Sequence, residues 1–130
     1  MGVKILCVDD EKNILSSLKM VFMDEDYEIL TALSGEEGLK LLQDNDVRLI
    51  ISDQRMPGMS GLEFLQKSKT VAPKAVRMVL TGYADVNDAV AAVNAGGAYK
   101  YITKPWDVSD LLSIVKDIIE NYKQIKEDGY

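Results

Sequence analysis

Apolar and polar residues alternate along the chain with two different periods. Short runs rich in Val, Ile and Leu, which are typical of β-strands, lie at residues 3–9, 27–33, 47–53, 75–81 and 98–103. The first, third and fourth runs are almost continuously apolar, as expected for strands that are covered on both faces. The pattern therefore predicts five strands of a buried, parallel sheet.

The segments between these runs have the spacing of amphipathic helices, with apolar residues three and four positions apart. The clearest stripes consist of Ile14, Leu15, Leu18, Val21 and Phe22, of Val86, Ala89, Val90 and Val93, and of Leu111, Leu112, Val115, Ile118, Ile119 and Tyr122. The last stripe predicts a final helix that continues through Tyr122.

Residues that cap helices mark where several of these helices begin. Ser34 and Ser60 are each followed three positions later by Glu, which is the capping-box pattern. Asp85 and Asp107 stand where N-caps are expected, just ahead of the fourth and fifth helices. The chain thus reads as five consecutive β–α units.

Parallel strands need crossover connections, and right-handed crossovers place helices on both faces of one sheet. We therefore predict an α/β fold, a flavodoxin-like (βα)5 doubly wound parallel sheet. The expected strand order, 2-1-3-4-5, is that of known sheets of this kind, because the sequence pattern alone does not specify an order. A chain of 130 residues is long enough for one sizeable core.

Composition excludes several classes of function. The net charge of −6 argues against direct binding of nucleic acid by this segment, since such binding starts from a basic patch. The sequence contains no histidine, which rules out His-based catalysis and His-ligated zinc. Its one cysteine, Cys7, lies in an apolar run and is interpreted as a small core residue.

Signals for membranes and secretion are missing from the sequence pattern. No apolar run approaches the roughly 18 residues of a membrane span, and the N-terminus lacks the order of a signal peptide. We therefore expect no membrane partner and a cytoplasmic location.

Charged and hydroxyl side chains stand where the predicted strands end. The first strand ends in Asp9-Asp10, the third in Asp53 and the fourth in Thr81, and Lys104 follows the fifth. The carboxyl ends of parallel strands share one edge, where such sheets bind ligands. Taken singly, these residues could be helix caps, turn residues or an exposed lysine. Their joint placement at four strand ends favours one shared site.

Three converging carboxylates would repel one another unless a cation lay between them. Oxygen ligands without histidine or thiolate suit Mg²⁺. The hydroxyl of Thr81 and the ammonium of Lys104 could bind the oxygens of a phosphoryl group while a carboxylate attacks phosphorus, which would form an aspartyl-phosphate.

The segments "CVDDE", "LIISDQRMPGMSG", "VLTGYAD" and "YKYITKPWD" resemble those of a receiver domain of a two-component response regulator. The resemblance covers essentially all of residues 3–125. We therefore assign residues 1–125 to this domain and read 126–130 as a polar tail or the start of a linker. The residues of these segments are also similar to those of receiver domains joined to HD-type phosphodiesterases or kinase modules.

The resemblance implies a role for each residue of the shared site. Asp53 would accept a phosphoryl group from a sensor histidine kinase, and Thr81 and Lys104 would bind its oxygens. Mg²⁺ would be held by Asp53, by Asp10 directly, by Asp9 mostly through water, and by a backbone carbonyl. That carbonyl belongs to Arg55, and the bond between Lys104 and Pro105 is a candidate for the cis form.

The same resemblance implies a signalling switch and not an enzyme acting on a diffusing substrate. Phosphorylation would draw Thr81 inward and let Tyr101 fill the vacated space. This movement would remodel the face formed by the helix around 86–93, the strand 98–103 and the helix around 111–122. Apolar residues near that face also suggest a homodimer, namely Trp106, Val108, Ile114 and Ile125. The output domain or target is not encoded in these residues.

Two large side chains are expected beside the mouth of the site. Arg55 lies two residues after Asp53, and Tyr83 lies two residues after Thr81. Both would obstruct the approach of hydrolytic water, so we expect a long-lived phosphoryl state. The alternative is that both point into solvent.

Three other classes of protein fit the sequence less well. A flavodoxin-like cofactor binder would need a phosphate-cradling loop after the first strand, where this chain has "DDEKN". A metal-dependent phosphatase with an Asp nucleophile usually has a second acid two residues later, where this chain has Arg55. A scaffold independent of phosphorylation would not need Asp53, Thr81 and Lys104 together.

Overall fold

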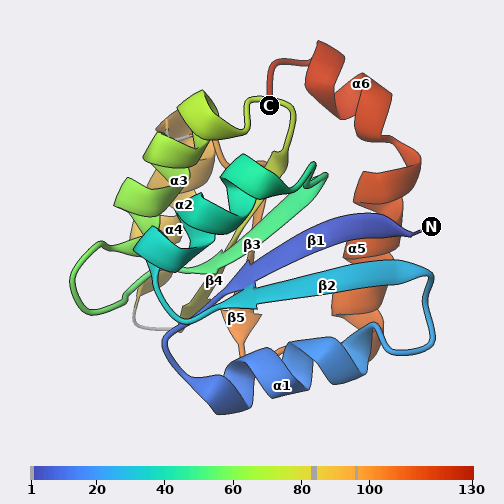
Figure 1. Ribbon diagram of the computed structural model, residues 1–130, viewed down its shortest axis with the longest axis horizontal. Coiled ribbons are helices and arrows are strands. Elements are labelled where there is room, and N and C mark those ends of the chain that lie inside the picture. Colours follow the sequence, from blue (N-terminus) through green and yellow to red (C-terminus); the bar gives the residue numbers. More distant parts are fainter. Residues whose placement is uncertain (1, 83–84, 96) are drawn as a thin grey trace.

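The computed structural model describes residues 2–82, 85–95 and 97–130, which form alternating strands and helices (Figure 1). The strands are β1 (Val3–Val8), β2 (Tyr27–Ala32), β3 (Leu49–Asp53), β4 (Val76–Gly82) and β5 (Lys100–Lys104). The helices are α1 (Lys12–Val21), α2 (Gly35–Asp44), α3 (Gly61–Val71), α4 (Val86–Ala95), α5 (Val108–Glu120) and α6 (Tyr122–Glu127).

The five strands form one parallel sheet in the order β2-β1-β3-β4-β5, which confirms the predicted fold and strand order. Strand β1 lies between β2 and β3, so that Leu6 aligns with Leu30 on one side and with Ile50 on the other. This register brings the carboxyl ends of β1 and β3 side by side. The neighbouring strands β4 and β5 complete the same edge.

Helices cover both faces of the sheet and create two hydrophobic cores (Figure 1). One core joins alternate residues of the central strands to α1, α5 and α6, with Leu18, Leu111 and Ile125 as examples. The other joins the remaining strand residues to α2, α3 and α4, with Leu42 and Phe64 as examples. The central strands are buried on both faces, as their continuous apolar runs predict.

The predicted helix caps are found at three starts. The hydroxyl of Ser34 accepts a hydrogen bond from the backbone N–H three residues later at 3.2 Å, and Ser60 does the same at 3.1 Å. The carboxylate of Asp107 accepts from the backbone N–H of Asp110 at 2.9 Å. These bonds satisfy backbone donors that a helix start leaves without an intrahelical partner.

Cys7 is fully buried, which confirms its reading as a core residue. Burial, with a smaller contribution from the nearby charge of Asp9, raises the pKa of its thiol to about 12. The thiolate that reagents attack is therefore suppressed at neutral pH.

The end of the chain differs from the single final helix that the sequence predicts. Helix α5 ends at Glu120, and Asn121 has a non-helical backbone before α6 begins. Ile125 and Tyr122 thus belong to α6, and Ile125 is buried in the core. The expected polar tail also folds onto the domain, because Lys126 donates to the carbonyl of Pro73 at 2.8 Å. The apolar residues keep their helical spacing across Asn121, so the sequence pattern gives no sign that the helix ends there.

No helix of the described residues has the length and apolar character needed to cross a membrane.

Candidate functional site

Three carboxylates converge at the carboxyl edge of the sheet, as the sequence predicts. One carboxylate oxygen each of Asp9, Asp10 and Asp53 lies within 4.8 Å of the others. This arrangement results from the pairing of Val8 with Ser52, because the residue that follows each of them is an aspartate, Asp9 after Val8 and Asp53 after Ser52. Asp9 is fully buried and Asp53 is nearly so, whereas Asp10 is exposed. We call these three residues the acidic notch.

Lys104 reaches into the acidic notch from the end of β5. Its Nζ lies 3.0 Å from Oδ1 of Asp53 and 3.2 Å from Oδ2 of Asp9. Burial lowers the pKa of Lys104, but the hydrogen bond and charge of Asp53, together with Asp9, outweigh burial and raise it. Lys104 therefore remains an ammonium group that neutralises one of the three carboxylates.

Asp53 keeps a raised pKa despite this lysine. Burial is the largest cause, and the charge of Asp9 adds to it, while Lys104 and the backbone N–H of Gln54 act in the opposite direction. The notch thus holds more negative charge than its own residues neutralise. An oxygen-only donor set with excess negative charge fits a hard divalent cation such as Mg²⁺. Of the described residues, these three form a group able to hold such an ion.

Thr81 lies at the end of β4, almost completely buried, and its hydroxyl is already engaged. It donates to the side-chain oxygen of Gln54 at 2.8 Å, with a longer contact of 3.2 Å to the carbonyl of Gly82. Gln54 was not predicted as a site residue. The only signal for it in the sequence was its position directly after Asp53, at the point where the strand opens into a turn.

Gly61 allows the chain after β3 to close tightly around the site. Its N–H donates to the carbonyl of Gln54 at 2.9 Å. A Cβ at this position would lie 1.8 Å from the carbonyl oxygen of Asp53, a distance that no side chain tolerates. The first residue of α3 must therefore lack a side chain for the loop that carries Asp53 to take this path.

Arg55 forms ion pairs that pattern analysis missed. Its guanidinium lies 2.7 Å from the carboxylate of Asp85 and 3.8 Å from that of Asp88. These acids precede and begin α4, so Arg55 connects the β3–α3 loop to that helix. Asp85, expected as an N-cap, thus has a guanidinium partner. Tyr83, the other expected obstacle to water, lies outside the described residues.

Tyr101 is half-buried on β5 and packs against the core that faces α2, α3 and α4. It aligns with Val79 of β4, two residues before Thr81. The bond between Lys104 and Pro105 is cis, as the family resemblance suggested.

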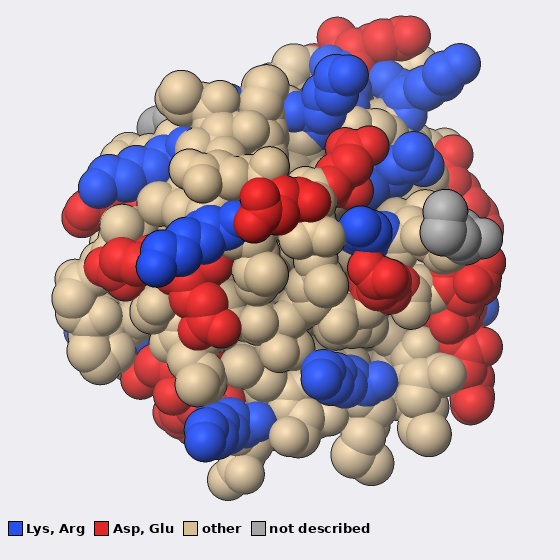
Figure 2. Space-filling model, in the orientation of Figure 1, with Lys and Arg blue, Asp and Glu red and all other residues tan. Residues whose placement is uncertain are grey.

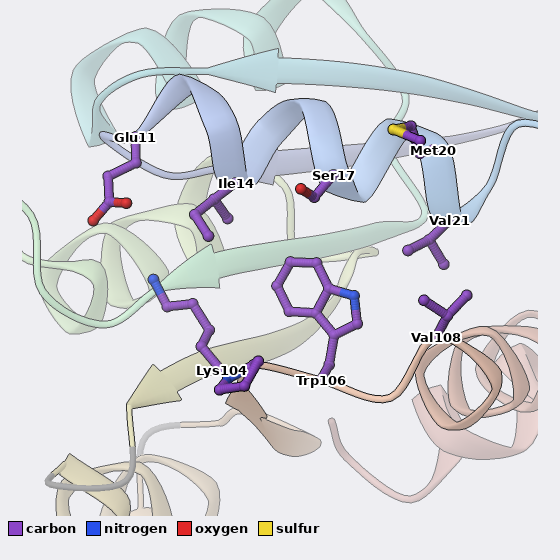
Figure 3. Close-up of a pocket in the computed structure, with 9 residues that line it drawn as sticks. Glu11, Ile14, Ser17, Met20, Val21, Lys104, Trp106 and Val108 are labelled. Carbon is purple, nitrogen blue, oxygen red and sulfur yellow. The ribbon is translucent and has the colours of Figure 1, made fainter.

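A groove of about 800 Å³ opens beside Lys104, between α1 and the start of α5 (Figure 3). The side chain of Trp106 extends from the segment after β5 toward α1, near Ile14 and Ser17 (Figure 3). Val108, which is 56% exposed, lies on the same groove. Trp106 and Val108, which the sequence suggested as part of a dimer face, thus also line this groove.

Positive and negative side chains are interspersed on the face of the molecule that carries α1 and β2 (Figure 2). One ion pair between charged side chains joins Lys116 of α5 to Glu25, with 3.3 Å between the lysine Nζ and the carboxylate.

This fold, with an acidic notch and an apposed lysine, defines the class of protein. Residues 5–116 match the response regulator receiver domain, and the chain belongs to this family. Receiver domains are the phosphorylated signalling switches of two-component systems, and they interact with histidine kinases. Family membership favours this reading over the cofactor binder and the phosphatase.

Two relatives of this chain differ in how much of their own length the chain covers. The chain is 40% identical over 123 residues to the hydrogenase transcriptional regulatory protein HoxA of Bradyrhizobium diazoefficiens, covering 95% of this chain and 25% of the relative. It is 28% identical to sporulation initiation phosphotransferase F of Bacillus subtilis, covering 98% and 99% of the two chains. The chain thus spans about a quarter of the length of HoxA.

A solved structure with the same fold is the signal receiver domain of an HD domain-containing protein from Pseudomonas fluorescens Pf-5. The TM-score is 0.88 at 31% identity, covering 97% of this chain and 93% of the other.

Proposed function

We propose that Asp53 is the phosphoacceptor of a phosphorelay and receives its phosphoryl group from a phosphohistidine of a partner kinase. One oxygen of the Asp53 carboxylate attacks phosphorus, the bond between phosphorus and the imidazole nitrogen breaks, and the electron pair leaves with the imidazole. The observation that carries this proposal is the position of Lys104, whose ammonium contacts both Asp9 and Asp53 beside the exposed Asp10.

Mg²⁺ is the ion that the acidic notch would hold. Asp10, Asp53 and Asp9 supply carboxylate oxygens, and the carbonyl of Arg55 is proposed as a further ligand. When bound, the ion would neutralise the oxygens of the incoming phosphoryl group. Lys104 supplies a second positive charge at the same position, and burial of Asp9 and Asp53 strengthens these interactions.

We infer that the switch acts through Thr81 and Tyr101. A phosphoryl oxygen would compete with Gln54 for the hydroxyl of Thr81, which donates to Gln54 at 2.8 Å. Movement of Thr81 toward the phosphoryl group would draw the end of β4 inward, and Tyr101 would follow. The remodelled face consists of α4, β5 and α5, where an output domain or partner would dock.

Incubation with acetyl phosphate and Mg²⁺, followed by intact mass measurement, tests the phosphoacceptor. We expect the gain of one phosphoryl group, lost in Asp53→Asn and in the absence of the metal. Asp46→Asn is the matched control, because that residue precedes β3 and lies outside the notch. Retained labelling in Asp53→Asn contradicts the assignment, and turnover of added phosphomonoesters supports the phosphatase instead.

Arg55 and Tyr83 are proposed to slow loss of the phosphoryl group by obstructing water. The side chain of Arg55 is 71% exposed, as the solvent-facing alternative expects, but its ion pairs with Asp85 and Asp88 hold the guanidinium between the β3–α3 loop and α4, which supports this role. Arg55→Ala and Tyr83→Ala should accelerate phosphate loss severalfold, and Asp85→Asn should do so less by freeing Arg55. Unchanged rates in Arg55→Ala and Tyr83→Ala would contradict obstruction.

A phosphorylation-dependent homodimer through α4, β5 and α5 is a further proposal. Burial of Ile125 in the core removes one residue that suggested it, while Ile114 remains half-buried against that core. Analytical ultracentrifugation with and without beryllofluoride, a phosphoryl mimic, tests the association. A monomer under both conditions would end the proposal. We also propose a cytoplasmic location, where kinase domains would supply the phosphoryl group.

A further inference from the structure

A second charged pocket lies at the opposite edge of the sheet, where the parallel strands begin. It has a volume of about 320 Å³, and its lining includes Lys69 of α3, Arg77 of β4 and Lys126 of α6. Gly97, Gly129 and Tyr130 complete much of its wall. We call this the cationic pocket. Nothing in the proposed phosphoacceptor function requires it.

Arg77 is the most deeply buried member of the cationic pocket, with only 2% of its surface exposed. Its guanidinium donates to the hydroxyl of Ser68 at 3.1 Å and to the carbonyls of Ala75 and Ala72 at 2.6 and 3.2 Å. All three acceptors are neutral. These bonds use three of the five guanidinium hydrogens and leave its positive charge without a carboxylate, which is uncommon for a buried arginine.

Lys126 places a second positive group beside Arg77. Its Nζ donates to the carbonyls of Pro73 at 2.8 Å and Ala75 at 3.3 Å, and to the main-chain oxygen of Tyr130. The carbonyl of Ala75 thus accepts from both cations. Burial, and then the charge of Arg77, lower the pKa of Lys126, as expected for like charges held together.

Lys69 adds a third positive group from the side of α3. Gly97 has a positive φ of 80°, and a Cβ there would lie 2.4 Å from the Nζ of Lys69. The absence of a side chain at Gly97 thus creates the space that the ammonium of Lys69 occupies. This lysine is exposed, so its charge can move toward a bound ligand.

Within residues 2–82, 85–95 and 97–130, the ion pairs with Asp or Glu involve other cations and none of these three. No carboxylate side chain lines the pocket in that part of the chain. Where the oxygen of Tyr130 belongs to a free carboxylate, it supplies one negative charge against three positive groups. The balance stays positive in a protein whose net charge is −6.

We propose that the cationic pocket binds a small phosphate anion, either inorganic phosphate or a diphosphate group. Oxyanions accept several charge-assisted hydrogen bonds at once, and guanidinium and ammonium groups are suited to them. The ligand would lie against Gly129 and Tyr130, and so would hold α6 to the start of β4. Binding would couple the level of this anion to the stability of the C-terminal segment.

The test is a titration of the metal-free protein with sodium phosphate and sodium pyrophosphate, followed by backbone amide NMR. We expect saturable shifts at the amides of Gly97 and Gly129, and no comparable shifts with sodium chloride at equal ionic strength. A tighter response to pyrophosphate would identify a diphosphate ligand. A tighter response to phosphate would identify the monophosphate.

Lys69→Gln is the decisive variant because Lys69 is exposed and forms no ion pair with a described acid. We expect it to weaken binding about tenfold, the usual worth of one charge-assisted hydrogen bond. Lys126→Gln should act in the same direction. Lys67→Gln on α3 and Lys123→Gln on α6 are matched controls that lie outside the pocket lining and should change affinity less than about twofold.

Absence of shifts at Gly97 and Gly129 in tens of millimolar phosphate would overturn the proposal, as would equal losses in the control variants. Shifts confined to Asp10 and Asp53 would assign the anion to the acidic notch instead. Phosphoryl uptake from acetyl phosphate, measured on the same variants, reports on the proposed function separately and should be unchanged.

Discussion

The acidic notch and the cationic pocket lie at opposite ends of β4, which carries a buried Thr81 at one end and a buried Arg77 at the other. In the notch, buried carboxylates have an ammonium within 3.2 Å. In the pocket, the buried guanidinium of Arg77 donates only to neutral oxygens. Each region keeps a surplus of one sign, so the comparison indicates a cation as ligand at one end and an anion at the other.

The largest expected effect is that of Gly61→Ala. The added Cβ would meet the backbone oxygen of Asp53 at 1.8 Å, so the backbone itself must move. We expect a loss of about 3 kcal/mol in the free energy of unfolding, the upper range for overpacking, together with loss of phosphoryl uptake. Urea denaturation and intact mass measurement report the two effects.

Two other glycines make this prediction specific to the notch. A Cβ at Gly82 would meet no atom of the described residues within 4 Å, so Gly82→Ala should lose little stability by crowding. In Gly97→Ala the atoms nearest the new Cβ belong to the flexible end of Lys69, but the change would force a non-glycine residue to a φ of 80°, at a cost of about 1 kcal/mol. Equal losses in Gly61→Ala and Gly82→Ala would contradict the role of close approach at Asp53.

The next effect concerns the metal. Asp10→Asn removes the exposed carboxylate of the notch, and we expect affinity for Mg²⁺ to fall about tenfold or more. Trp106, the only tryptophan, lies near Lys104 and can report the titration through its fluorescence. Glu11→Gln removes an adjacent charge that is not part of the notch, so it should have a smaller effect. Identical losses in the two variants would indicate a general effect of charge.

Much of the fold was predictable because local patterns determine it. Three caps formed as predicted, at Ser34, Ser60 and Asp107, because their hydrogen bonds lie within three residues. The break at Asn121 was not predictable, since α5 and α6 present a continuous apolar spacing. Strand order came from known sheets of this kind, because the sequence of one chain does not specify which strands become neighbours.

The residues of the site that stand at strand ends were predictable from the sequence. The hydrogen bonds and ion pairs that their side chains form were not. Asp9, Asp10 and Asp53 converge because parallel strands end at one edge. The hydrogen bond from Thr81 to Gln54 and the ion pairs of Arg55 depend on the course of the loops. The spacing of apolar residues along the chain contains no information about that course. The charge of the cationic pocket was also missed, because Arg77 stands inside an apolar run.

A third prediction uses the raised pKa of Asp53. The folded state favours the protonated carboxyl of Asp53, so ionising this group lowers the free energy of unfolding. Below the ordinary pKa of 3.8 this loss of stability is absent. It develops as the pH rises through the higher pKa of the folded state. Metal-free Asp53→Asn should therefore be more stable than the native protein at pH 7. The difference should disappear as the pH falls below 3.8.

Thermal unfolding in a chelator, over a range of pH, measures this difference. Millimolar Mg²⁺ should then stabilise the native protein more than Asp53→Asn, because the ion binds the folded notch. A native protein that is the more stable one at pH 7 without metal would contradict the raised pKa, and would mean that Lys104 alone compensates for burial of Asp53.

The smallest effect should come from Lys69→Glu, which places a carboxylate in the cationic pocket. We expect a gain of about 0.5 kcal/mol in the free energy of unfolding, since exposed ion pairs contribute little. Lys67→Glu on the same helix removes the same charge but faces Glu63, whose carboxylate lies 3.9 Å from Lys67, so it should reduce stability. Opposite signs for the two variants would demonstrate that charge is unbalanced at the pocket and balanced next to it. The same sign in both would mean that neutral oxygens alone satisfy Arg77 and Lys126, and the indication of an anionic ligand would be lost.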